Sequence, residues 1–413
     1  MTLDPVHFDG IAALARRITQ HVDEQDHRDA AETVWQEFLD PLRHDGDVVL
    51  EPLDGVRRRK APVQELALQP APFDAVNGLD SGTINPRTFK NGLVLDIAQA
   101  AMSATPSDLD LHRSRTVVAS VHSNDATVDY GGNEWDRFDA GYGRGRIIKA
   151  PPVNRFEDAV VHSLSLYLAE SAHALQHADA VSDLLVLDGP LYPKGLLNWR
   201  EQSRELAHLL TEHDIVREAI ENYLRLVERF VDRDVPLVGF VKNTSARGLT
   251  NVLRTKTHAP WAHDMAFFSQ VLERRDGGER LTDDLTWTNW FRSRLGADAT
   301  FSTRGDGLSF DRALDADQYE VTFFVVYDPR TDIGYKVEAP YAFTRDPEVR
   351  AAIERQVLRD VAAERGPPLA VAKADELARI SVNEKHSLVG RLEDEFGSDV
   401  DRNYDDERWE KTG

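Results

Sequence analysis

The stretch AVNGLDSGT, residues 75–83, ends an apolar run with an aspartate and then continues into Ser, Gly and Thr. The chain repeats this pattern in LLVLDGPLY, residues 184–192. Each apolar run predicts a buried strand, so each aspartate lies where a strand ends. Aspartate before Ser or Gly is common in turns, which is one interpretation. The other is an active site, because ligands gather beyond strand ends in sheets flanked by helices.

The rest of the chain predicts helices interleaved with strands. An apolar period of about 3.6 residues indicates helices over residues 8–42, 156–176, 198–232, 346–364 and 370–396. Strands are expected over residues 113–123, 182–189 and 235–243, and the segments YEVTFFVVYD and GYKVEAPYAF favour antiparallel strands. Residues 124–154 are polar and Gly-rich, which indicates a hairpin or a long loop. The predicted class is mixed α/β or α+β.

The chain has 413 residues, no cysteine and a formal net charge of −22. Thiolate nucleophiles and cysteine-based metal sites are therefore excluded, and any metal must bind oxygen or imidazole ligands, which favours Mg²⁺ or Mn²⁺. The acid excess, with only 10 Lys among 49 basic residues, indicates a halophilic source, where salt screens self-repulsion. There is no apolar run of about 18 residues and no secretory leader, so we expect no membrane contact and a cytoplasmic location.

A third carboxylate has an unusual position. Glu170 lies late on the predicted helix 156–176, near its apolar face. A charge there needs compensation, unless the residue lies on the helix rim and contacts solvent or a neighbouring Arg. With Asp80 and Asp188, it indicates a site where converging carboxylates hold two divalent cations about 4 Å apart for phosphoryl chemistry.

Several segments, in this order, resemble the NurA nuclease family of archaeal enzymes that process DNA ends. The segments are LDSGTINPRTFKNGL, the helix of Glu170 followed by LLVLDG, then LVGFVK, KVEAPYAF and GPPLAVAKADELARI. The resemblance covers roughly residues 70–392 and implies an RNase H-like mixed sheet flanked by helices. We accordingly expect an N-terminal helical extension over residues 1–65, a nuclease domain over 66–396 and an acidic flexible tail over 397–413.

The resemblance also implies the central site residues. Asp80 and Asp188 match the two strand-end aspartates of the family, and Glu170 matches its helix glutamate. Lys242, in GFVKN, matches a lysine at a strand end. This lysine is expected to bind the scissile phosphate or to offset repulsion between the carboxylates.

The C-terminal metal ligand of the family is a His or an Asp. Alignment on GPPLAVAKADEL assigns this role to Asp375, and His386 in NEKHSL is the competing candidate. Pro367 stands where the family often has a tyrosine, so a role for a tyrosine hydroxyl is in doubt.

Local basic groups are the candidate DNA contacts, because cations bind phosphates and aromatic rings stack on bases. The segment GYGRGR and the residues after it form the first group, for which a solvated hairpin is the alternative. A second group follows the strand that ends near Lys242. The candidate residues are Arg144, Arg146 and Lys149 in the first group, and Arg247 and Arg254 in the second.

By resemblance, the chain is expected to be a DNA nuclease that uses Mn²⁺ or Mg²⁺. The expected activities are 5′-to-3′ exonuclease cleavage and endonuclease cleavage of single-stranded DNA, during end processing at double-strand breaks. The resemblance further implies a homodimer that binds single- and double-stranded DNA ends and works with a hexameric HerA-type ATPase. Two alternatives stay open: an inactive adaptor of the same fold that binds DNA or the HerA-type motor, and a metal-dependent phosphodiesterase for small substrates.

Overall fold

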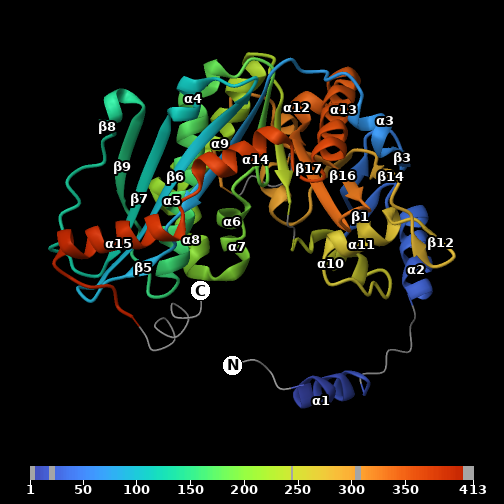
Figure 1. Ribbon diagram of the computed structural model, residues 1–413, viewed down its shortest axis with the longest axis horizontal. Helices are drawn as coiled ribbons and strands as arrows, with labels where there is room; N and C mark the ends of the chain where they lie inside the picture. The colour runs from blue at the N-terminus through green and yellow to red at the C-terminus, as the bar shows by residue number, and fades with distance from the viewer. Residues whose placement is uncertain (1–4, 18–23, 243–244, 303–307, 403–413) are drawn as a thin grey trace.

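The computed structural model describes residues 5–17, 24–242, 245–302 and 308–402. Most of the described strands form one large mixed sheet, and helices cover both of its faces (Figure 1). None of the described helices is long and apolar enough to cross a membrane. The mixed α/β class predicted from the sequence is confirmed.

Five strands in one half of the sheet make up the RNase H-like core. They are β4 (Val76–Thr83), β6 (Leu93–Thr105), β7 (Arg115–Ser123), β10 (Leu184–Asp188) and β11 (Leu237–Val241). Their order in the sheet is β7-β6-β4-β10-β11. β4, β6 and β7 form an antiparallel meander, whereas β10 runs parallel to both β4 and β11. This arrangement is the predicted RNase H-like mixed sheet.

Three further strands extend this half of the sheet: β9 (Gly143–Lys149), β8 (Asp136–Phe138) and β5 (Arg87–Thr88). β8 and β9 pair as an antiparallel hairpin, and β9 also runs parallel to β7. The Gly-rich segment 124–154 therefore contains a hairpin, one of the two predicted forms, and this hairpin is part of the main sheet.

The other half of the sheet is antiparallel. It contains β1 (Leu42–His44), β2 (Asp47–Pro52), β3 (Arg58–Pro62), β14 (Asp284–Thr288), β15 (Phe291–Ser293), β16 (Val321–Asp328) and β17 (Ile333–Pro340). β16 and β17 pair along their whole length, as the sequence predicts, and β17 joins this half to β11. A separate small hairpin is formed by β12 (Arg275–Asp276) and β13 (Glu279–Arg280).

The predicted N-terminal helical extension is only partly helical. α1 (Pro5–Ala15) and α2 (Glu24–Glu37) are helices, but β1, β2 and β3 follow them within the predicted extension. β2 pairs with β15, and β3 pairs with β14. The sheet satisfies the backbone groups of this segment, so residues 42–62 belong to the main domain.

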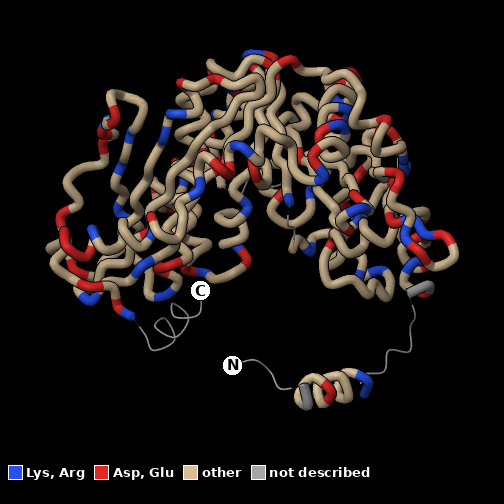
Figure 2. The backbone as a smooth tube through the Cα atoms, viewed as in Figure 1, with Lys and Arg blue, Asp and Glu red and all other residues tan. Residues whose placement is uncertain are grey.

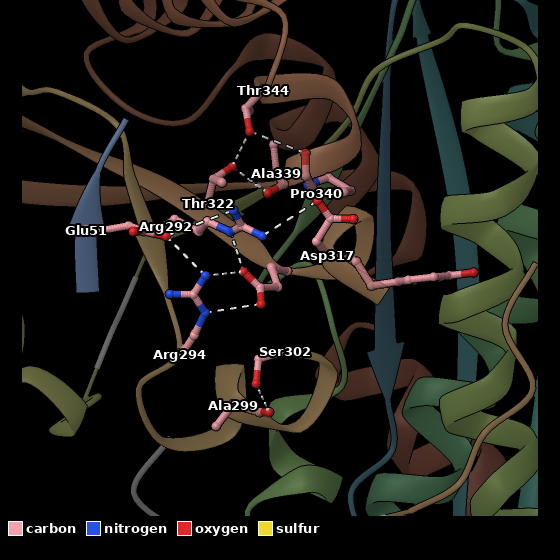
Figure 3. A network of polar contacts seen from close by, with 12 residues as sticks. Glu51, Arg292, Arg294, Ala299, Ser302, Asp317, Thr322, Ala339, Pro340 and Thr344 are labelled. Carbon is pink, nitrogen blue, oxygen red and sulfur yellow. Dashed lines mark hydrogen bonds and ion pairs between the residues drawn. The ribbon is translucent and has the colours of Figure 1, made fainter. Parts of the chain in front are cut away.

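A charged network also ties β2 to the sheet (Figure 3). Arg294, directly after β15, lies 3.0 Å from the carboxylate of Glu51 on β2. Arg292 and Arg294 both bind the buried carboxylate of Glu320. The network joins an N-terminal strand to β15 and to Glu320, the residue directly before β16.

Helices cover the two faces of the sheet in separate groups. One face carries α2, α5 (Glu157–His177), α8 (Arg204–Glu212), α9 (Asp214–Asp232), α10 (Gly248–Arg254) and α11 (Asp264–Leu272). The other face carries α3 (Val63–Ala67), α13 (Pro347–Glu364), α14 (Leu369–Ala378) and α15 (Val382–Phe396). Short helices lie in connections: α4 (Leu109–Arg113), α6 (Lys194–Leu197), α7 (Trp199–Gln202), α12 (Tyr341–Thr344), and the 3₁₀ turns η1 (Asp139–Gly141), η2 (Ala178–Ala180), η3 (Gly296–Phe301) and η4 (Ala316–Tyr319).

β10 is buried on both faces, which explains its unbroken apolar sequence. Leu184 and Val186 pack in the core on the α13 and α14 side. Leu185 and Leu187 pack in the core on the α5 and α9 side. Asp188 ends the strand and is its one charged residue.

Candidate metal centre

Asp80 and Asp188 are neighbours because β4 and β10 are adjacent parallel strands. Leu79 of β4 pairs with Leu187 of β10. Asp80 and Asp188 are the next residues along each strand, so their side chains leave the same face of the sheet. β10 ends at Asp188 as predicted, but the prediction that a strand ends at Asp80 is wrong, because β4 stays paired with β6 as far as Thr83. The two carboxylates therefore lie where one strand stops and its neighbour continues.

Glycines on both sides of Asp80 let α14 approach β4 closely. Gly78 and Gly82 are on the same face as Asp80, because side chains alternate along a strand. A Cβ at Gly78 would lie 2.2 Å from the carbonyl oxygen of Ala370, and one at Gly82 would lie 2.3 Å from that of Ala378. Both clashes are with helix backbone, so a side chain at either position would push α14 away.

Two hydrogen bonds from β6 hold α14 in this place. Ser103 Oγ donates to the carbonyl oxygen of Ala370 at 2.5 Å. Gln99 Nε2 donates to the carbonyl oxygen of Ala378 at 3.1 Å. Both ends of the helix are therefore fixed on the sheet, and so is Asp375 between them.

Docking of α14 completes a group of three carboxylates, which we call the acidic cluster: Asp80, Asp188 and Asp375. One carboxylate oxygen from each residue lies within 4.8 Å of those of the other two. In the part of the chain that the structure describes, this is the one group of three or more His, Asp or Glu side chains close enough to share a metal ion. The structure thus brings together three of the four residues expected to hold a metal, and their role as ligands stays a prediction.

Burial and mutual repulsion set the electrostatics of the acidic cluster. The pKa of Asp80 is raised to about 9, first by burial and then by the charges of Asp188, Glu170 and Asp375. Burial also raises the pKa of Asp188, and the ammonium group of Lys242 opposes that rise. The Nζ atom of Lys242 lies 2.5 Å from Oδ2 of Asp188. Carboxylates as close together as Asp80 and Asp188 favour binding of a cation. A bound cation would lower the pKa values of both residues.

Glu170 lies beside the acidic cluster and reaches it from the α5 side of the sheet. Ser81 Oγ donates to its Oε1 at 2.7 Å, and the Tyr223 hydroxyl donates to its Oε2 at 2.9 Å. Burial raises the pKa of Glu170 to about 7, and these two hydrogen bonds oppose the rise. Ser81 is the neighbour of Asp80 on β4, so it connects Glu170 to the cluster. The assignment of Glu170 as a metal ligand stays a prediction.

The donor set of the acidic cluster fits a hard divalent cation. Mg²⁺, Mn²⁺ and Ca²⁺ prefer oxygen ligands, and three carboxylates supply more negative charge than the nearby cations balance. His386 is exposed on α15 and lies outside the cluster, so the geometry favours Asp375 over His386 as the C-terminal ligand. Pro367 lies in the turn between α13 and α14.

The first predicted group of DNA contacts lies on β9 and holds protein partners in the structure. Arg144 stacks on Trp135, with 4.2 Å between the guanidinium carbon and the ring centroid, and its Nη2 donates to the carbonyl of Ala172. Arg146 pairs with Glu218 at 2.5 Å. These contacts bind β9 to α5 and α9, so DNA binding by this group stays a prediction.

The remaining candidates, Lys149, Arg247 and Arg254, are all exposed. Lys149 lies 5.2 Å from the ring centroid of Tyr130. Arg254 donates to the carbonyl oxygen of Trp261 at 2.7 Å. Arg247 is exposed at the start of α10. The structure leaves their role in DNA binding as a prediction.

Three residues of the site were missed in the sequence. Ser81 and Tyr223 hold Glu170, and Arg379 donates to Oδ2 of Asp375 at 3.0 Å. The Asp-Ser pair at 80–81 was a visible signal for Ser81. Tyr223 and Arg379 show no such signal in the sequence, because nothing there distinguishes them from other polar residues on a helix or at its end. Only their tertiary contacts identify them.

Comparison with known proteins places the chain in a family. The family model for the NurA domain matches residues 74–380. The NurA nuclease from Sulfolobus solfataricus has a similar structure, with 12% identity, 96% of this chain and 98% of that chain covered, and a TM-score of 0.48. A NurA structure bound to dAMP and manganese matches with 12% identity, 82% and 90% coverage, and a TM-score of 0.43. No curated protein matches the chain. Since the family model covers well over half of the sequence, this chain belongs to the NurA domain family.

Proposed function

We propose that this protein is a DNA nuclease that depends on Mn²⁺ or Mg²⁺. The observation that carries the proposal is the acidic cluster at the step between β4 and β10, in a chain of the NurA domain family. Three carboxylates on rigid elements are the ligand type that phosphodiester hydrolysis by divalent cations requires. Manganese is the first cation to test, because a NurA protein has been solved with it.

The residues of the chain divide into three roles in this proposal. Asp80, Asp188 and Asp375 hold the cation, which when bound supplies positive charge to the phosphate and lowers the pKa of water. Lys242 orients Asp188 and adds positive charge at the edge of the cluster. Glu170, with its pKa near neutrality, is placed to accept a proton from a water at the α5 side or to bind a second cation.

The proposal extends to the biological setting that the family resemblance implies. The enzyme would act as a 5′-to-3′ exonuclease and as an endonuclease on single-stranded DNA in the cytoplasm. It would work as a homodimer with a HerA-type hexameric ATPase during end processing at double-strand breaks. This sequence has no Walker-type ATP motif, so the ATPase would supply the motor that feeds DNA to the dimer.

Two other functions compete with this proposal. An inactive adaptor would bind DNA or the motor without cleaving DNA, and Pro367 at the usual tyrosine position is the feature that favours it. A metal-dependent phosphodiesterase for small substrates would cleave a chromogenic phosphodiester and ignore DNA. The acidic cluster supports the nuclease and the phosphodiesterase equally, and the family supports the nuclease.

The deciding experiment uses purified protein with single- and double-stranded DNA labelled at either end. Reactions contain Mn²⁺, Mg²⁺ or a chelator, at high and low salt. The nuclease predicts degradation with Mn²⁺ that stops with chelator and is lost in Asp188→Asn. Cleavage that persists in Asp188→Asn would remove the proposed site. No cleavage by the wild type, with retained DNA binding, would favour the adaptor.

A further inference from the structure

Arg379 is a basic residue of the site to which neither the sequence resemblance nor the family comparison gives a role. It directly follows α14, and its side chain is 66% exposed. Its Nη2 lies 3.0 Å from Oδ2 of Asp375. Lys242 makes the equivalent contact with Asp188, and its side chain is 33% exposed. The cluster therefore has one cationic side chain on each of its two outer carboxylates.

The backbone beside Arg379 is rigidly placed. The carbonyl oxygen of the preceding residue, Ala378, accepts a hydrogen bond from Gln99 and lies directly over Gly82. Ser381, two residues later, caps α15 through a capping box with Glu384. Arg379 thus stands on a short, fixed connection between two helices, with a long exposed side chain at the edge of the cluster.

We propose that Arg379 binds the substrate phosphate that lies on the acidic cluster. This inference rests on the proposed function. A cation on the cluster would engage the carboxylate oxygens, including those of Asp375, and so weaken the hold of Asp375 on the guanidinium. A phosphate bound to that cation would then be the nearest anion. The planar guanidinium matches two phosphate oxygens at once, whereas an ammonium acts as a point charge.

The alternative is an ordinary surface ion pair between residues four apart on a helix. Such pairs are common and contribute little to stability. The chain offers a matched example on α9, where Arg225 lies 3.4 Å from Glu221 and its side chain is 60% exposed. Arg225 has the same spacing and similar exposure but lies away from the acidic cluster, so it serves as the control.

The test compares Arg379→Ala, Arg379→Lys and Arg225→Ala in the full-length protein. Binding of a fluorescent single-stranded oligonucleotide is measured with Ca²⁺, a cation of oxygen sites, and cleavage is measured with Mn²⁺. Arg379→Ala should weaken binding at least fivefold and reduce kcat/KM at least tenfold. Arg379→Lys should recover part of both, and added guanidinium ion should partly rescue cleavage by Arg379→Ala. Arg225→Ala should behave as the wild type.

Two results in the binding assay would overturn the inference. One is binding by Arg379→Ala within twofold of the wild type; the other is an equal loss in Arg225→Ala, which would show a general charge effect. Mn²⁺ affinity, measured by calorimetry, should be unchanged or tighter in Arg379→Ala, and a weaker affinity would assign Arg379 a structural role instead. If the wild type binds DNA and never cleaves it, the nuclease proposal fails, while the binding comparison still decides the role of Arg379.

Discussion

Two clusters of charged side chains, one partly buried and one buried, differ in the balance between carboxylates and cations. In the acidic cluster, three carboxylates lie together with Glu170 beside them, and the pKa of Asp80 is raised to about 9. In the second, which we call the paired cluster, Lys194 lies 2.6 Å from both Asp298 and Glu338, and Lys336 lies 2.7 Å from Glu338. There the pKa of Glu338 is lowered to about 2 by the two ammonium groups, although burial opposes this shift.

Burial of carboxylates therefore does not by itself indicate a functional site. Both clusters desolvate carboxylates, but the paired cluster supplies its own cations and carries no net charge among its four members. The acidic cluster has more carboxylates than cationic neighbours. Stability of the fold does not require such an excess of like charge. Figure 2, in which the backbone is coloured by charged residue type, shows acidic and basic residues mixed along most of the chain. An unbalanced, converging group is therefore the feature that indicates function.

The largest effect is expected from Asp80→Asn in the acidic cluster. Metal-dependent cleavage should fall on the order of 1,000-fold, because the central carboxylate is lost. The metal-free variant should be as stable as the wild type or more stable, by about 1 kcal/mol, because repulsion is relieved. Urea unfolding in chelator measures the stability. A clear loss of stability together with activity would mean that Asp80 is a structural residue.

The paired cluster should respond in the opposite way to loss of charge. Lys194→Met leaves buried carboxylates with one cation fewer and should cost about 3–5 kcal/mol of unfolding free energy. Lys90, paired with Asp399 on the surface, provides the control. Lys90→Met should change the free energy by less than about 1 kcal/mol. Equal effects of the two substitutions would contradict the claim that the paired cluster is structural.

Stability in acid should also depend on the paired cluster. The folded pKa of Glu338 lies below the ordinary value of 4.5, so its contribution is present above pH 4.5 and is lost as the pH falls towards 2. The contribution is on the order of 3 kcal/mol. Urea unfolding between pH 6 and 3 should show a steeper loss in the wild type than in Glu338→Gln. Parallel curves would remove Glu338 as a source of acid sensitivity.

Gly78→Ala tests how α14 brings Asp375 to the acidic cluster. The added Cβ would meet helix backbone at 2.2 Å, so the helix must shift, at a cost on the order of 2 kcal/mol, and metal affinity should fall with it. Gly390 on α15 has open space around its Cα. Gly390→Ala should be neutral or slightly stabilising, because Ala favours helix. Unchanged metal affinity in Gly78→Ala would show that the position of Asp375 does not affect metal binding.

Part of this arrangement could be read from the sequence. The apolar runs before Asp80 and Asp188 indicate buried strands, and the helix period places Glu170 near an inward face. The two aspartates are neighbours because β4 and β10 are adjacent in the sheet. The family resemblance implied this adjacency, whereas the local sequence pattern did not predict it. The strands β2 and β3 were missed because their partners in the sheet, β15 and β14, lie more than 200 residues later in the chain, and β1 was missed with them because it pairs with β2. Tyr223 and Arg379 were missed for the same reason: their partners are set by packing.

The central claim is that the acidic cluster is a cation site. Isothermal titration of chelator-treated protein with Mn²⁺ tests this claim without reference to DNA. We expect the wild type and the surface control Glu221→Gln to bind Mn²⁺ with the same affinity, and Asp80→Asn, Asp188→Asn and Asp375→Asn each to bind it at least about tenfold more weakly. Unchanged Mn²⁺ affinity in all three aspartate variants would contradict this claim.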